Sequence, residues 1–265
     1  MSELTPFDLT QRLAGKVAVI TGGGSGIGLA TAKRMRAEGA RIVIGDMDPT
    51  GGEAAAAAVD GLFVRVNVTD QEQVDHLFDT AAREYGSVDI AFNNAGISPD
   101  DDDSIETTEL PAWQKVQDVN LKSVYLCSRA ALRHMVRQGS GSIINTASFV
   151  AVMGSATSQI SYTASKGGVL AMSRELGVQF ARQGIRVNAL CPGPVNTPLL
   201  QELFASDPER AERRLVHVPL GRFARPEELA AAVAFLASDD ASFITASTFL
   251  VDGGISSAYT TPLSD

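Results

Sequence analysis

Apolar runs alternate with helical patterns from about residue 16 to residue 251. Short, continuous apolar runs predict strands at 16–21, 41–46, 62–66, 88–92, 142–147, 185–191 and 247–251. The segments between them predict helices at 26–38, 50–60, 70–85, 108–138, 161–183, 199–216 and 226–237. A repeated strand–helix–strand order favours parallel pairing with helices on both faces of the sheet. We therefore expect an α/β protein with a doubly wound parallel sheet of about seven strands in three layers.

No linker, charge block or change in composition divides the chain. We expect an N-terminal tail at 1–14 and one domain at 15–265. The 31 acidic and 22 basic residues give a net charge of −9, which argues against nucleic acid or an anionic membrane as the main partner. The two cysteines and three histidines are scattered, so neither a disulfide framework nor a metal site is expected. With no signal-peptide pattern and no apolar run of membrane-spanning length, a cytoplasmic location is predicted.

The segment Thr21-Gly22-Gly23-Gly24-Ser25-Gly26-Ile27-Gly28 joins the first predicted strand to the first predicted helix. Glycine permits positive φ and a close approach of the backbone to a ligand. A helix N-terminus supplies free N–H groups and a positive dipole end, which suit a diphosphate. The spacing departs from Gly-x-Gly-x-x-Gly, but the acidic Asp46 arrives at the expected distance. The alternative is a glycine-rich turn without a ligand.

Asp46 ends the second predicted strand. A carboxylate there can accept hydrogen bonds from both ribose hydroxyls and would repel a 2′-phosphate, so NAD is favoured over NADP. The next residue is Met47 rather than a cation. The alternative is that Asp46 only caps the following turn.

Small and polar residues follow the other predicted strands as well. They are Asn67 and Val68, Asn93 to Gly96, Ser148, and Pro192 to Thr197. Because ligands of such sheets bind beyond the carboxyl ends of the strands, these positions predict one binding edge.

Tyr162 and Lys166 are four residues apart in a predicted helix and share a face. A tyrosine has a pKa of about 10, and a neighbouring ammonium lowers it toward the range useful for acid–base catalysis. Ser148 follows a strand, where its hydroxyl could bind a substrate carbonyl, and Asn120 lies inside a predicted helix. The alternative for the pair is a surface tyrosine packed on a lysine stem.

Together these pieces resemble the short-chain dehydrogenase/reductase family from about residue 14 to 254, with a Rossmann-like fold. The matching segments are Thr21-Gly22-x-x-x-Gly26-x-Gly28, Asn93-Asn94-Ala95-Gly96, Asn120, Ser148, Tyr162-x-x-x-Lys166, Pro192-Gly193 and Asp252-Gly253-Gly254. The resemblance implies hydride transfer between a nicotinamide cofactor and an alcohol or carbonyl. It implies that Tyr162 is the acid/base and that Ser148 orients the carbonyl.

By the same resemblance, Lys166 lowers the tyrosine pKa and binds the nicotinamide ribose, and Asn120 holds a relay water. The expected cofactor-binding residues are Gly22, Ser25, Gly26, Ile27, Gly28, Asp46, Asn67, Val68, Asn94, Ala95, Gly96, Tyr162, Lys166, Pro192, Gly193, Val195 and Thr197. A substrate lid around 198–219 and a homotetramer are also implied. Asn67 departs from the usual aspartate, and the interval from Ser148 to Tyr162 is one residue longer than usual.

The run Asp100 to Asp103 is interpreted as a solvated loop, or else as a lip that repels anions or binds a cation. The expected function is an NAD(H)-dependent secondary alcohol dehydrogenase or ketone reductase with a small-molecule substrate. A 3-oxoacyl thioester reductase, a sugar or steroid alcohol as substrate, and a non-catalytic NAD-sensing protein remain alternatives.

Overall fold

The computed structural model describes residues 11–155, 157–198, 200–201 and 215–258. Its centre is one parallel sheet of seven strands in the order β3-β2-β1-β4-β5-β6-β7. The strands are β1 (Val17–Thr21), β2 (Arg41–Asp46), β3 (Leu62–Arg65), β4 (Ile90–Asn93), β5 (Gly141–Thr146), β6 (Ile185–Pro192) and β7 (Thr248–Val251). The predicted Rossmann-like doubly wound fold is therefore confirmed.

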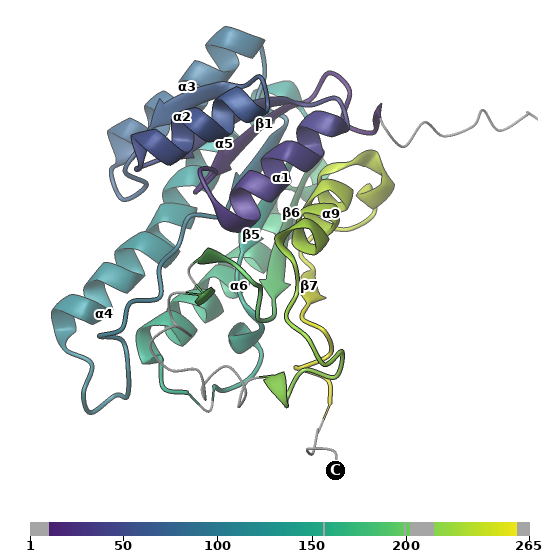
Figure 1. The fold of residues 1–265 in the computed structure, drawn as a ribbon. Helices are drawn as coiled ribbons and strands as arrows, with labels where there is room; N and C mark the ends of the chain where they lie inside the picture. Colours follow the sequence, from purple (N-terminus) through teal and green to yellow (C-terminus); the bar gives the residue numbers. More distant parts are fainter. Residues whose placement is uncertain (1–10, 156, 199, 202–214, 259–265) are drawn as a thin grey trace, which may run out of the picture.

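Helices cover both faces of the sheet (Figure 1). They are α1 (Gly26–Ala37), α2 (Pro49–Ala58), α3 (Gln71–Tyr85), α4 (Leu110–Gln117), α5 (Ser123–Gln138), α6 (Ile160–Phe180) and α9 (Pro226–Ala237). Short 3₁₀ turns occupy Phe149–Ala151, Ala181–Gln183 and Asp239–Ala241. Most of the helix predicted at 199–216, and of the lid expected at 198–219, lies outside the described residues.

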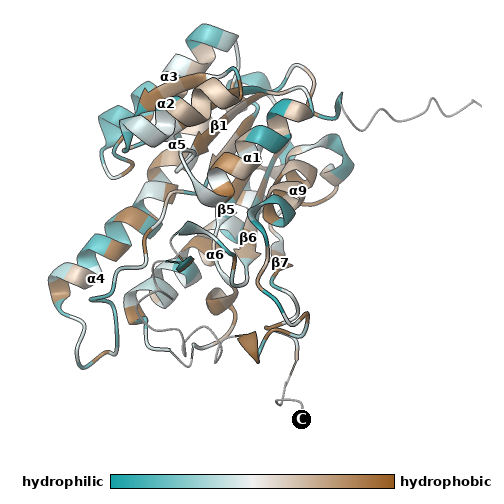
Figure 2. Ribbon diagram, viewed as in Figure 1, coloured by the Kyte–Doolittle hydropathy of each residue, from teal (hydrophilic) through white to brown (hydrophobic). Residues whose placement is uncertain are grey.

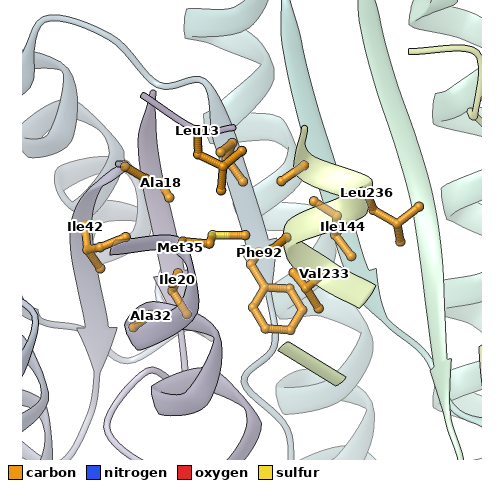
Figure 3. Close-up of a cluster of buried hydrophobic side chains, with 14 of the residues drawn as sticks. Leu13, Ala18, Ile20, Ala32, Met35, Ile42, Phe92, Ile144, Val233 and Leu236 are labelled. Carbon is orange, nitrogen blue, oxygen red and sulfur yellow. The ribbon is translucent and has the colours of Figure 1, made fainter. Parts of the chain in front are cut away.

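The core has two main layers because every central strand is buried on both faces. Ala18 and Ile20 of β1 pack in a cluster with α1 and α9, part of which Figure 3 shows, whereas Val17 and Val19 pack in a second cluster with α3 and α5. Strands buried on both sides read as continuous apolar runs rather than alternating ones. Figure 2 shows this pattern, with hydrophobic residues along the strands and hydrophilic ones on the outer turns of the helices.

The order of the strands creates a crevice beside β1. This strand pairs with β2 on one side and with β4 on the other, so the chain reverses its direction of winding between β3 and β4. At such a point the connections from two adjacent strands run to opposite faces of the sheet. A crevice opens between them at the carboxyl ends of the strands, and ligands bind in it. Among the described residues, no helix is long and apolar enough to cross a membrane.

Most boundaries lie within a few residues of the predicted ones, but two features differ more clearly from the expectation. The helix predicted at 108–138 is interrupted by a π-helical turn at Asp118–Lys122, where the Ser123 amide donates to the Asp118 carbonyl. Such widened turns often accompany functional sites. Leu13, expected in the tail, is fully buried in the core, and its amide donates to the Glu38 carbonyl at 2.9 Å. The domain therefore includes at least residues 11–14, because burial of the leucine side chain stabilises their docking.

Candidate active site

A cavity of about 1090 Å³ opens at the carboxyl edge of the sheet. One drug-sized ligand occupies a pocket of roughly 300–1,000 Å³, so this cavity has room for a dinucleotide and a small substrate. It gathers most of the residues predicted from the sequence. Those that line it are Gly22, Ser25, Gly26, Ile27, Asp46, Asn67, Val68, Asn94, Ala95, Gly96, Ser148, Tyr162, Lys166, Pro192, Gly193, Val195 and Thr197. Gly28 and Asn120 lie behind this surface.

The glycine turn between β1 and α1 needs glycine for two separate reasons. Gly22 has a φ of +64°, and a Cβ there would lie 2.9 Å from the Ala95 Cα. Gly28 lies under the turn, where a Cβ would be 2.0 Å from the Gly22 carbonyl oxygen. Gly28 thus packs helix α1 against the turn, and the residues before it form the surface that faces the cavity.

The start of α1 is suited to a diphosphate. The first turn of this helix carries no acidic residue, and within the described part of the chain the Ser25 side chain makes no capping hydrogen bond. The first N–H groups of a helix lack intrahelical partners and carry the positive end of its dipole. Ser25, Gly26 and Ile27 all line the cavity, so these residues fit a bound phosphate group.

Asp46, at the end of β2, is oriented by the glycine turn. Its Oδ2 accepts a hydrogen bond from the Gly24 amide at 2.8 Å, and its Oδ1 accepts one from the Asp48 amide at 3.1 Å. The carboxylate therefore organises the following turn and also faces the cavity. Each carboxylate oxygen has a second lone pair that could accept a hydrogen bond from a ribose hydroxyl.

Asn94 connects β4 to the glycine turn. Its side-chain Nδ2 donates to the carbonyl oxygens of Thr21 at 3.3 Å and Gly22 at 3.1 Å, and its amide donates to the Thr21 hydroxyl at 3.1 Å. The loop after β4 and the turn after β1 are thereby held together across the crevice. Asn94 therefore lines the cavity and also holds the glycine turn in place.

Asn120 is fully buried in the π-helical turn, and its side chain is engaged by the backbone of Ile97. Its Oδ1 accepts from the Ile97 amide at 2.8 Å, while its Nδ2 donates to the Ile97 carbonyl at 2.9 Å and to the Ser165 hydroxyl at 3.3 Å. The amide therefore ties the loop after β4 to helix α6. Both ends of the side chain are therefore engaged by protein groups.

Tyr162 and Lys166 occupy successive turns of α6 on the side of the cavity. The Lys166 Nζ lies 5.5 Å from the centroid of the Tyr162 ring and donates to the Thr146 carbonyl at 2.7 Å. Burial lowers the pKa of Lys166 to about 8, because a low-dielectric environment disfavours its charged form. At pH 7 the side chain is still mostly an ammonium and can stabilise a phenolate.

Ser148 lies two residues beyond the end of β5. It is 4 % exposed, lines the cavity, and accepts a hydrogen bond from the Val150 amide at 3.4 Å. That bond begins the 3₁₀ turn at Phe149–Ala151. The hydroxyl hydrogen is not used by this contact, so the serine can donate to a substrate oxygen.

Several residues of the cavity were not predicted from the sequence. Met47, Lys115, Thr146, His217 and Ile255 also line it. His217 is exposed and lies within the segment expected to form the lid, but it was not assigned to the site. Proximity to Asp46 could have indicated Met47, but no local pattern marks Lys115, Thr146 or Ile255.

The run Asp100 to Asp103 was interpreted as a solvated loop, and for Asp102 this was wrong. Asp102 is only 6 % exposed, and its carboxylate accepts hydrogen bonds from the Ser161 and Tyr162 amides, both at 2.8 Å. The other three aspartates are exposed, as expected. Asp102 is buried because it caps helix α6.

Comparison with known proteins agrees with this geometry. The family model described as "Enoyl-(Acyl carrier protein) reductase" matches residues 22–256. Cis-4-hydroxycyclohexanecarboxylate dehydrogenase of Sinomonas cyclohexanicum is 44% identical over 248 residues, which are 92% of this chain and 98% of that protein. The 3-oxoacyl-[acyl-carrier-protein] reductase FabG of Thermotoga maritima is 38% identical over 250 residues, 92% of this chain and 99% of that protein.

A solved structure with the same architecture is that of levodione reductase. It superposes with a TM-score of 0.89 at 39% sequence identity, and the match covers 93% of this chain and 100% of that one. The family match, the relatives and the arrangement of the site agree on one class of chemistry. The chain belongs to the short-chain dehydrogenase/reductase family and is an oxidoreductase that uses a nicotinamide cofactor to interconvert an alcohol and a carbonyl group.

Proposed function

We propose that this protein is an NAD-dependent dehydrogenase that oxidises a secondary alcohol on a compact apolar ring and, in reverse, reduces the corresponding ketone. The observation that carries the proposal is the convergence of Ser148, Tyr162 and Lys166 on the cavity that also contains the glycine turn and Asp46. A hydroxyl donor, an acid/base and a cation then meet beside a dinucleotide site.

The proposed division of roles follows from the chemistry of each side chain. Ser148 donates a hydrogen bond to the substrate oxygen and orients it. Tyr162, as phenolate, accepts the hydroxyl proton of the alcohol while the C–H hydride leaves and the carbonyl forms. The bound nicotinamide supplies the hydride acceptor. Lys166 stabilises the phenolate electrostatically, so that the pKa of the Tyr162 hydroxyl approaches the working pH.

The substrate class is inferred from the apolar part of the cavity wall. Apolar side chains contribute there, namely Phe149, Met153, Leu200, Val216 and Ile255. A compact apolar ring would cover these side chains and exclude water from them. It carries no polar group of its own that would be buried without a hydrogen-bond partner. The relative that is 44% identical is named for a hydroxycyclohexane carboxylate, which supports a six-membered ring.

A substrate panel with NAD, read at the absorbance of NADH, tests the proposal. It would contain cyclohexanol, cis- and trans-4-hydroxycyclohexanecarboxylate, 2-hexanol and a 3-hydroxyacyl thioester. We expect the highest kcat/KM with a cyclic alcohol. A preference for the thioester would instead support the 3-oxoacyl thioester reductase, the alternative that the similarity to FabG favours. NADH binding without turnover of any compound would support a cofactor-sensing protein.

Asp46 is proposed to set the preference for NAD over NADP. Asp46→Asn removes the negative charge but keeps the shape of the side chain. We expect the ratio of kcat/KM with NADP to that with NAD to rise by at least about tenfold, or about 1.4 kcal/mol, because the repulsion of the 2′-phosphate is lost. The measurement is the steady-state rate with each cofactor.

Glu53→Gln, at an exposed position on α2, is the matched control for the change in charge, and its ratio should stay within about twofold of the parent. A parent enzyme that prefers NADP, or an unchanged ratio in Asp46→Asn, would contradict the assignment.

We further propose a homotetramer in the cytoplasm. Exposed apolar side chains support assembly: Tyr125 on α5 is 52% exposed, Val178 on α6 is 73% exposed and Phe243 before β7 is fully exposed. Burial of such side chains between subunits would be favourable. The buried free thiols of Cys127 and Cys191 fit a reducing compartment. Sedimentation as a monomer at micromolar concentration would contradict the tetramer.

A further inference from the structure

Asp102 is a buried carboxylate outside the set of residues to which the reaction has been assigned. It lies in the loop between β4 and α4, 60 residues before Tyr162 in the sequence. Its Oδ1 accepts from the Ser161 amide and its Oδ2 from the Tyr162 amide, both at 2.8 Å. A buried charge is tolerated only where such hydrogen bonds replace those to water. Two N–H donors at a helix end satisfy this condition.

The same segment supplies the whole N-terminal cap of α6. Among the described residues, the N-cap Gln159 makes no side-chain capping hydrogen bond. The Ile160 amide donates instead to the Asp103 carbonyl at 3.1 Å, and Asp102 receives the next two amides. Unpaired N–H groups at a helix start need partners, and a negative charge there is favoured by the dipole. Helix α6 therefore depends on a distant loop for its first turn.

The peptide groups on both sides of the Tyr162 Cα are held by side chains. Its amide donates to Asp102, and its carbonyl accepts from the Ser165 hydroxyl at 2.7 Å. Ser165 in turn accepts from Asn120 at 3.3 Å, and Asn120 holds Ile97 at the beginning of the same loop. The loop after β4 is thus attached to α6 at two points. Ile97 is connected to Ser165 through Asn120, and Asp102 binds the amides of Ser161 and Tyr162 directly.

We propose that Asp102 is a positioning residue for catalysis, which fixes the backbone of Tyr162 so that its hydroxyl meets the substrate oxygen. The inference rests on the proposed role of Tyr162 as acid/base. The cap matters because proton transfer requires the Tyr162 hydroxyl to lie within hydrogen-bond distance of the substrate oxygen. A displacement of the hydroxyl by about 1 Å can lower the rate roughly 100-fold. Asp102 does not contact the reacting atoms and acts only through the helix.

The test compares Asp102→Asn and Asp102→Ala with Asp101→Asn, an exposed neighbour that loses the same charge. The amide of Asp102→Asn can accept one of the two hydrogen bonds, and alanine can accept neither. The concentration of NADH-binding sites is titrated by fluorescence, and kcat is expressed per site. We expect kcat to fall about 3- to 10-fold in Asp102→Asn and about 10- to 100-fold in Asp102→Ala, with the Kd of NADH within about twofold of the parent.

A purely structural role would reduce the number of NADH-binding sites and leave kcat per site unchanged, and that outcome would overturn the proposal. Asp101→Asn should match the parent in both quantities, and an equal loss of kcat in this control would also overturn it, because a general charge effect would then suffice. If Asp102→Ala does not fold, the isosteric Asp102→Asn decides. Tyr162→Phe is measured in the same assay. Full turnover by that variant would refute the proposed function, whereas full turnover by the Asp102 variants alone would refute only this inference.

Discussion

Tyr162→Phe is expected to lower kcat by about 10³-fold, in line with the 10²- to 10⁴-fold contribution of a positioned general acid or base. The substitution removes one hydroxyl and keeps the ring. The backbone bonds that hold the residue, to Asp102 and from Ser165, remain available. The fold and the dinucleotide site should therefore persist, so the Kd of NADH should change by no more than about threefold, or about 0.7 kcal/mol.

The matched control is Tyr125→Phe, which removes the same hydroxyl from an exposed position on α5. Its kcat should stay within about twofold of the parent, because Tyr125 does not line the cavity and phenylalanine keeps the ring that the proposed subunit contact would bury. Rates are measured with the best alcohol of the panel, and binding is measured by quenching of NADH fluorescence. Turnover of Tyr162→Phe at the parental rate would remove Tyr162 from the mechanism.

Lys166→Met is expected to abolish most activity and to make the protein more stable at pH 7. The loss of activity, about 10²-fold or more, follows because no ammonium then favours the phenolate of Tyr162. The gain in stability follows from burial: Lys166 is 3% exposed, and its pKa falls from 10.5 to about 8. This difference corresponds to about 3 kcal/mol of unfavourable free energy for the charged form in the folded protein. Loss of the hydrogen bond to Thr146 offsets about 1 kcal/mol of it.

The stability difference should depend on pH in a defined window. Below pH 8 lysine is charged in both states, and folding carries the full cost of burying the charge. Between about 8 and 10.5 the unfolded chain binds more protons than the folded one, so the free energy of unfolding of the parent rises with pH. The advantage of Lys166→Met should therefore shrink across this window.

Urea unfolding of the cofactor-free parent and of Lys166→Met at pH 7, 8.5 and 10 measures this dependence. Lys33→Met, at an exposed position on α1, should show a small difference that does not vary with pH. A Lys166→Met protein that is less stable than the parent at pH 7 would contradict the interpretation of Lys166 as a residue kept for catalysis at the expense of stability.

Most of the architecture could be predicted from local sequence patterns. The runs Val17–Ile20 and Ile42–Ile44 are continuous and apolar because both faces of β1 and β2 are covered, and this is the signature of a parallel sheet. The glycines and Asp46 could be proposed as a dinucleotide site because the proposed roles depend on backbone freedom and charge, both of which are properties of the residue itself. That Tyr162 and Lys166 share one helix face could be predicted because four residues make about one helical turn.

The π-helical turn at Asp118–Lys122 is not visible in the apolar periodicity, although Asn120, a poor helix former inside the predicted helix, lies within it. Residues 108–138 read as one helix by periodicity, whereas the structure shifts the helical hydrogen bonds where Asn120 holds the backbone of Ile97. Leu13 was assigned to a tail for a similar reason. A single apolar residue among polar ones has no period, and its burial depends on the surface that α1 and α9 present.

The sequence by itself determined the class of fold, and it predicted the edge at which ligands would bind and the residues that we propose as acid/base, cation and dinucleotide turn. Each of these is encoded in residues that are close together in the chain or in the ends of successive strands. Only the tertiary structure decided which aspartate of an acidic run is buried and that its partner is the Tyr162 amide. A hydrogen bond across 60 residues leaves no local pattern, because it depends on where two separately formed elements come to rest against each other.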